Sequence, residues 1–119
     1  MVKPELRAVE AGGRTVDDPT EETLGDLLSE MNLQHRFVIL ERLDLEPTDQ
    51  HYIQVYLNDD YSYQVEYREG SADKHYQAHV PRLHEVFGPE QSVAKVMTDW
   101  AHGGQGWREA LPWVPKPFR

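Results

Sequence analysis

The chain has 119 residues, of which 39% are hydrophobic, and this size suits one small domain. It has no cysteine, which excludes disulfides, thiolate catalysis and zinc–thiolate sites, and it has no apolar run of membrane-spanning length and no apolar leader, so we expect a cytoplasmic protein. The net charge of −9, with the acidic excess in residues 1–80, disfavours nucleic acids and anionic membranes as partners and favours a basic partner.

The first predicted element is a helix that begins near residue 18. Residues 1–16 show no sustained period, so we expect a flexible N-terminal arm followed by a single α+β domain over residues 17–119. Asp18 is expected to cap the helix, with Pro19 as its first residue and Glu21 closing a capping box. Four apolar residues at helical spacing then share one face: Leu24, Leu27, Leu28 and Met31.

Three strands are predicted after this helix. Residues 37–40 form a short apolar run that is typical of a central strand buried on both faces. Residues 51–57 and 61–68 alternate with period two, which predicts a hairpin around Asn58-Asp59-Asp60. A register that places the apolar residues of both strands on one face pairs Leu57 with Tyr61, Val55 with Tyr63, and Ile53 with Val65.

The remaining chain predicts one more strand and one more long helix. Residues 74–80 form a fourth strand that Pro81 ends, and residues 82–88 are a connection. Pro89 begins a helix that Gly103 ends, with an apolar stripe made of Val93, Val96, Met97, Trp100 and Ala101. A short helix over residues 107–111 precedes a proline-rich extended segment over residues 112–118. The predicted fold class is α+β: a four-stranded antiparallel β-meander with two main helices packed on one face.

The side chains that carry chemistry form no recognisable active site. His75 and His79 are four residues apart, which separates them by about 13 Å on a strand, so we expect no metal site. Glu66 and Glu69 could take part in acid–base chemistry, yet Glu66 occupies a solvent-facing strand position. Nucleophile-elbow, P-loop and dinucleotide-binding motifs are absent from the sequence. We therefore expect a protein with no catalytic residues and no cofactor.

The tryptophans near the C-terminus have two interpretations. Trp100 lies on the apolar stripe of the second helix and is expected in the core. Trp107 and Trp113 flank the short helical segment. They pack the C-terminal segment onto the sheet, or one of them anchors an interface beside Arg108.

Several short strings occur in a characteristic order along residues 17–113. They are Asp18-Pro19-Thr20 before a leucine-rich helix, His51-Tyr52-Ile53-Gln54-Val55, Tyr63-Gln64-Val65-Glu66-Tyr67-Arg68, His75-Tyr76, Trp100-Ala101-His102-Gly103 and Trp107-Arg108-Glu109-Ala110-Leu111-Pro112-Trp113. In this order they resemble small immunity proteins of bacterial polymorphic toxin systems, the family typically encoded beside deaminase-type toxins in actinobacteria. The resemblance implies a protein that neutralises a toxin and has no catalytic activity of its own.

The predicted function is therefore binding of a basic protein partner, by a chain that is itself a monomer or a homodimer. The expected contact residues are exposed side chains of the hairpin's polar face and turns: Tyr52, Tyr56, Asp59, Asp60, Glu66 and Glu69. Two alternatives stay open. One is a cytosolic α+β domain that binds a small ligand or homodimerises through a sheet edge or the tyrosine face. The other is an enzyme that uses histidine or glutamate side chains.

Overall fold

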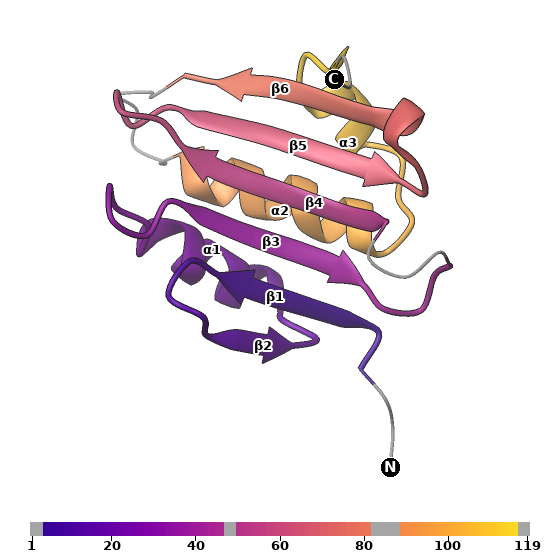
Figure 1. Cartoon of the computed structure of the whole chain (residues 1–119), viewed down its shortest axis with the longest axis horizontal. Helices are drawn as coiled ribbons and strands as arrows, with labels where there is room; N and C mark the ends of the chain where they lie inside the picture. Colours follow the sequence, from indigo (N-terminus) through magenta and orange to yellow (C-terminus); the bar gives the residue numbers. More distant parts are fainter. Residues whose placement is uncertain (1–3, 47–49, 82–88, 117–119) are drawn as a thin grey trace.

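The computed structural model describes residues 4–46, 50–81 and 89–116, which form an α+β fold (Figure 1). The strands are β1 (Leu6–Glu10), β2 (Thr15–Asp17), β3 (Phe37–Arg42), β4 (His51–Leu57), β5 (Tyr63–Glu69), β6 (His75–Val80) and β7 (Val114–Pro115). The helices are α1 (Glu21–Ser29), α2 (Pro89–Ala101) and α3 (Trp107–Ala110), with a 3-10 turn at Ala72–Lys74. The strands form one sheet in the order β2-β1-β3-β4-β5-β6-β7, and every neighbouring pair is antiparallel.

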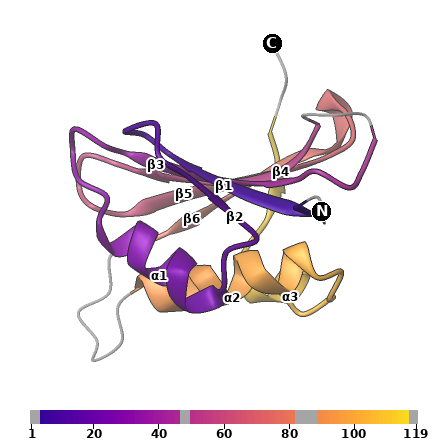
Figure 2. The ribbon, with the colours of Figure 1, turned by 90° about the horizontal axis from the view of Figure 1, so that it is seen from below.

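The predicted four-stranded meander is the centre of this sheet rather than the whole of it. Strands β3 to β6 follow one another as neighbours, which confirms that part of the prediction. Among the described residues, the sheet has three further strands, because β1 and β2 extend it beyond β3 and β7 extends it beyond β6. Figure 2 shows α1 and α2 packed on one face of the sheet, as expected, with α3 on the same side. Among the described residues, no α-helix lies on the other face, which we call the open face.

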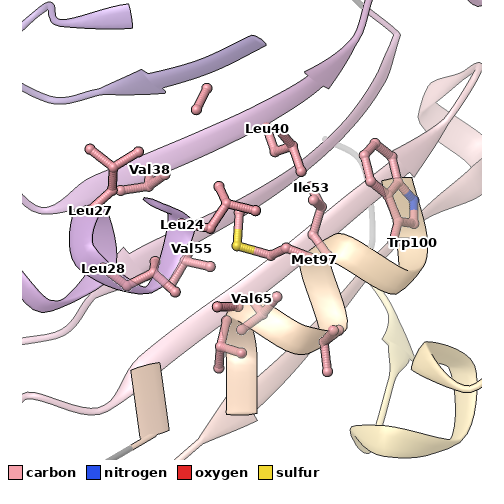
Figure 3. Close-up of a cluster of buried hydrophobic side chains, with 14 of the residues drawn as sticks. Leu24, Leu27, Leu28, Val38, Leu40, Ile53, Val55, Val65, Met97 and Trp100 are labelled. Carbon is pink, nitrogen blue, oxygen red and sulfur yellow. The ribbon is translucent and has the colours of Figure 1, made fainter. Parts of the chain in front are cut away.

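The core lies between the sheet and the two longer helices (Figure 3). Alternate residues of the central strands point into it, and each is buried: Val38, Leu40, Ile53, Val55, Leu57, Tyr63, Val65 and Tyr67. The helices contribute Leu24, Leu27, Leu28, Val93, Val96, Met97, Trp100 and Ala101, which confirms both predicted apolar stripes except for the half-buried Met31. Strand β3 is buried on one face only, because Phe37 and Ile39 are half-buried on the open face, and the expectation of burial on both faces is wrong.

The β4–β5 hairpin has the predicted faces but a different register. Leu57 pairs with Tyr63 and Val55 with Val65, so the predicted pairing of Val55 with Tyr63 is wrong. The turn is longer than expected, since Tyr61 and Ser62 belong to it and the backbone N–H of Asn58 donates to the carbonyl of Ser62 at 2.9 Å. A slip of two residues leaves every side chain on the same face, because the side-chain period of a strand is two.

The expected flexible N-terminal arm is an ordered part of the sheet from residue 6 onward. Strand β1 pairs with β3, and Leu6 and Ala8 are buried against the core. Gly12-Gly13 forms the turn of a β1–β2 hairpin, where Gly13 has φ +97° and its N–H donates to the carbonyl of Glu10 at 2.9 Å. This part of the arm prediction is wrong, because a glycine pair between two short β-prone segments indicates a hairpin.

The cap of α1 is two residues later than predicted. Thr20 is the N-cap, and its side-chain oxygen accepts from the N–H of Thr23 at 3.1 Å. Asp18 instead has φ +46° and accepts hydrogen bonds from the N–H groups of Glu5 and Leu6 at 3.0 and 3.1 Å. The carboxylate of Asp18 therefore holds the start of β1, and the predicted capping role is wrong.

The C-terminal part of the described chain folds back onto the sheet. Trp107 is buried, and its ring packs edge-on against Tyr67 at 4.7 Å, which excludes it as an exposed interface anchor. Trp113 is half-buried, packs edge-on against the same tyrosine at 4.7 Å, and donates from Nε1 to the carbonyl of Trp107 at 3.0 Å. Beyond it the chain is extended, as predicted, and β7 pairs with β6. Phe118 and the predicted connection over residues 82–88 lie outside the described residues.

Two glycines, one inside a helix and one with a positive φ, provide the first test. A Cβ on Gly25, inside α1, would meet only the Cβ of Ala94, at an ordinary contact distance of 3.9 Å. Gly25→Ala should therefore raise the free energy of unfolding by about 0.5–1 kcal/mol, because alanine favours helix. Gly103 has open space but φ +77°, so Gly103→Ala should lower it by about 1 kcal/mol. Urea unfolding measures both, and a destabilising Gly25→Ala would contradict the described helix packing.

The C-terminal segment provides the second test. Deleting residues 112–119 removes the Trp113 ring from Tyr67 and the pairing of β7 with β6. We expect the free energy of unfolding to fall by about 2 kcal/mol, the scale of burying one large apolar side chain. Val114→Ala is the control, since this side chain is exposed and should change stability little. A truncated chain as stable as the full chain would show that the segment contributes nothing to the core.

Candidate functional site

The open face of the sheet carries most of the residues that the sequence singled out. Its side chains come from alternate positions of three central strands: Tyr52, Gln54 and Tyr56 of β4; Gln64, Glu66 and Arg68 of β5; His75, Gln77 and His79 of β6. Apart from buried His75, these side chains are half-buried or exposed. Strand alternation thus gives the sheet one apolar, covered face and one polar face with aromatic rings.

A hydrogen-bonded polar cluster forms on the β6 side of this face. Nε2 of His75 lies 2.8 Å from Oε1 of Glu66, and Nε of Arg68 donates to Nδ1 of His75 at 3.1 Å. Because a guanidinium can only donate, the imidazole has its proton on Nε2 and donates it to Glu66. The ring of Tyr52 packs edge-on against His75, with centroids 6.0 Å apart, and lies under Arg68.

The C-terminal segment completes this cluster. Lys116 follows β7, and its backbone N–H donates to the carbonyl of His75 at 3.0 Å. Its ammonium group donates to Oε1 of Glu66 at 2.7 Å. Burial of Glu66 opposes ionisation, but the hydrogen bonds from Lys116 and His75 outweigh it and hold the pKa of Glu66 below its ordinary value. The Glu66 side chain is therefore a carboxylate with two cation or N–H partners.

The hydrogen bonds of the polar cluster fix the positions of its side chains on the open face. Both ring nitrogens of His75 are hydrogen bonded to protein side chains, so neither is positioned to accept a proton from a substrate. His79 lies on the same face of β6 but is exposed. Within residues 4–46, 50–81 and 89–116, no group of three histidine, aspartate or glutamate side chains could hold a metal ion.

The six predicted contact residues fall into three places. Tyr52 and Glu66 belong to the polar cluster, whereas Tyr56 lies at the other end of β4, about 13 Å along the strand. The side chains of Asp59 and Asp60 are exposed in the β4–β5 turn, which follows the end of β4 that carries Tyr56. Glu69 is separate from both groups: it ends β5, shares the covered face with Tyr67, and forms an ion pair with Arg108 of α3 at 2.8 Å.

Sequence reasoning missed the residues around the β4–β5 turn. Arg36, just before β3, forms an ion pair with Asp59 at 2.7 Å and donates to the carbonyl of Leu33 at 3.1 Å. Tyr61, expected in the strand, lies in the turn with φ +66° and is exposed. No local pattern marks Arg36, because its contacts depend on the pairing of β3 with β4. Tyr61 had a weak signal, since the turn lacks glycine and some residue had to take a positive φ.

The helix side of the molecule carries acidic groups as well. A shallow groove runs between α1 and α2 and is lined by Glu21, Glu22, Gly25, Asp26, Ser29, Glu90, Gln91 and Ala94. A second groove along α2 and α3 is lined by Val96, Trp107 and Leu111 among other residues. The acidic residues of the chain therefore lie on both sides of the sheet.

Comparisons with known proteins add no evidence on the function of these residues. No protein-family model matches the chain, and searches of curated proteins and of solved structures find no match. In the described part of the chain, no helix has the length and apolar character needed to cross a membrane.

The polar cluster predicts how stability depends on pH. Because the folded state lowers the pKa of Glu66 from 4.5, its stabilising contribution is complete above that pH and is lost as the pH falls through the lower, folded value. Glu66→Gln should destabilise the protein by about 1–3 kcal/mol at pH 7 and should lose less stability than the parent on acidification. Urea unfolding at pH 7 and below pH 4 measures the difference. Parallel stability curves for Glu66→Gln and the parent would contradict this role.

Proposed function

We propose that this chain is a cytoplasmic, non-catalytic binding domain that neutralises a basic protein partner, in the manner of the immunity proteins its sequence strings resemble. The observation that carries the proposal is the open face of the sheet, which presents tyrosine and polar side chains and borders the exposed acidic residues of the β4–β5 turn. Asp59 and Asp60 lie in that turn, where Arg36 pairs with Asp59 and lies 5.8 Å from the ring centroid of Tyr56. Tyrosine and carboxylate side chains together suit a partner rich in arginine or lysine.

The charge of the whole molecule supports the same partner. A net charge of −9 attracts a basic protein over a Debye length and repels nucleic acid. Acidic side chains of the groove between α1 and α2, such as Glu22 and Asp26, add to this field from the helix side. Long-range attraction therefore does not depend on which face makes contact.

The bonding of the polar cluster supports a binding role rather than a catalytic one. General acid–base catalysis needs a group that can exchange a proton with a substrate. Both ring nitrogens of His75 and Oε1 of Glu66 are already hydrogen bonded, to each other, to Arg68 and to Lys116. Such a network gives the face a fixed shape, which lowers the entropy lost when a partner binds.

The test is binding to the protein encoded by the adjacent gene, measured by surface-based kinetics with the purified full chain. We expect a complex whose association rate falls about tenfold or more as salt rises from about 0.05 to about 0.5 M, because screening weakens electrostatic steering. Dissociation should depend on salt much less.

Two results would count against this function. One is the absence of any complex with the neighbouring gene product, and the other is an association rate indifferent to salt. Sedimentation of the chain alone is the accompanying control, since a stable homodimer that covers the open face would favour the alternative of self-association.

A further inference from the structure

Exposed apolar side chains gather at one end of the sheet. Leu33, Tyr56 and Tyr61 are 41%, 36% and 44% exposed, and all three lie around the β4–β5 turn. Leu33 comes from the loop between α1 and β3, and Figure 1 shows this loop at the same end of the sheet as the turn. Residues from two separate segments therefore build one patch. We call it the turn surface and define it by Leu33, Arg36, Tyr56, Asp59, Asp60 and Tyr61.

Arg36 joins the two segments. Its guanidinium donates to the carbonyl of Leu33 at 3.1 Å, pairs with Asp59 at 2.7 Å, and lies 5.8 Å from the ring centroid of Tyr56. The pairing of β3 with β4 adds a backbone hydrogen bond of 2.7 Å from Leu57 to the carbonyl of Arg36. The loop and the turn are thus held in one arrangement before any partner arrives.

The backbone conformation at position 61 of the turn favours glycine, whereas the chain has tyrosine there. Tyr61 has φ +66°, a conformation that glycine adopts at no cost and that a residue with a Cβ adopts at a cost in free energy. The turn holds Tyr61 there, because its N–H donates to the carbonyl of Asn58 at 2.9 Å and Asp60 accepts from the N–H of Ser62 at 2.9 Å. Backbone strain of this kind is common at functional sites. This strained conformation places an exposed tyrosine side chain at the tip of the hairpin.

The two aspartates give the patch its charge. The Asp59 side chain is 87% exposed even though it pairs with Arg36. Hydrogen bonds from the side chain and backbone of Ser62 lower the pKa of Asp60, so this carboxyl group is ionised at neutral pH. Tyrosine faces beside carboxylates form a good environment for a guanidinium or ammonium group, which stacks on the ring and pairs with the acid.

We infer that the turn surface binds arginine or lysine side chains of a basic protein partner, with Tyr61 and Tyr56 as the stacking rings and Asp60 as the pairing acid. The inference rests on the function proposed above and narrows it. Of the six contact residues predicted from sequence, it keeps Tyr56, Asp59 and Asp60. Tyr52 and Glu66 then serve the polar cluster, and Glu69 serves its ion pair with Arg108.

A peptide probe tests the surface without the natural partner. Acetyl-Arg-Gly-Arg-amide is titrated into the full chain and followed by amide chemical shifts, with acetyl-Gln-Gly-Gln-amide as the neutral control. We expect shifts around residues 33–36 and 56–62 with the arginine peptide only. Tyr61→Gly should raise the dissociation constant about threefold, the size of an exposed cation–π contact, while Tyr61→Phe should keep the parent value.

A matched pair of charge variants separates local contact from general attraction. Asp60→Asn and Asp26→Asn make the same chemical change at exposed positions, one in the turn surface and one in the groove between α1 and α2. We expect only Asp60→Asn to weaken the arginine peptide. Equal effects of the two variants, or a dissociation constant unchanged by Tyr61→Gly, would overturn the turn surface. Unfolding curves check that Tyr61→Gly, which suits the backbone, remains folded.

The natural partner distinguishes the two levels of the proposal. With the neighbouring gene product, Tyr61→Gly should raise the dissociation constant about tenfold or more, as expected for a central aromatic contact. A complex that binds the parent and Tyr61→Gly equally would overturn the turn surface and leave the proposed function standing. Peptide binding at the turn without any complex would overturn the proposed function and leave the cation-binding surface supported.

Discussion

The alternation of apolar and polar residues along β3 to β6 is the constraint on which the rest of this structure depends. Because successive side chains of a strand point to opposite faces, it sends Val38, Ile53, Val55 and Val65 to a single face and leaves each of them fully buried. That face is stable only when covered, and the apolar stripes of α1 and α2 cover it. The open face follows as a consequence. It keeps the polar half of each strand, and the side chains available for recognition are those that the core did not require.

The elements that depend on this periodicity could be predicted from the sequence, whereas the details that individual side-chain hydrogen bonds decide could not. Both helices and the inward faces of β4 and β5 follow from spacing alone. The register does not, because a slip of two residues leaves the apolar pattern unchanged and the bonds of Asp60 to Ser62 choose between the alternatives. Asp18 shows the same limit. An aspartate before a proline fits a helix cap, yet its carboxylate binds the N–H groups at the start of β1, a contact between residues 12 and 13 positions apart. Strand β1 itself was missed because five residues with two buried side chains give too short a pattern.

The candidate site divides in the same way. Tyr56, Asp59 and Asp60 could be predicted as exposed, since they end a strand or lie in its turn. The position of Glu69 follows from parity, because it shares the covered face with Tyr67 and Val65, although its chemistry made it look like a contact residue. Lys116 could not be predicted as a partner of Glu66. The two residues are 50 positions apart, and they meet only because β7 pairs with β6 at the edge of the sheet. Arg36 is comparable, since the β3–β4 pairing is what brings it to Asp59.

These pairings also decide where negative charge is available to a partner. Glu66 lies on the open face, but Lys116 pairs with it and its side chain is only 13% exposed. Glu69 is similarly paired with Arg108. Acids exposed to water lie in the β4–β5 turn, along α1 and at scattered positions such as Asp73 and Glu109. Long-range attraction sums over all of these acids, whereas a contact uses only the acids that it touches. For the proposed basic partner, acids outside the contact, such as those of α1, would contribute to the rate of encounter. The lifetime of the complex would depend on the side chains it buries, because charges at a distance act on association and desolvated contacts act on dissociation. Under the proposed function, such a domain would gain its association rate from its whole surface and its specificity from the few side chains that the sheet holds in fixed positions.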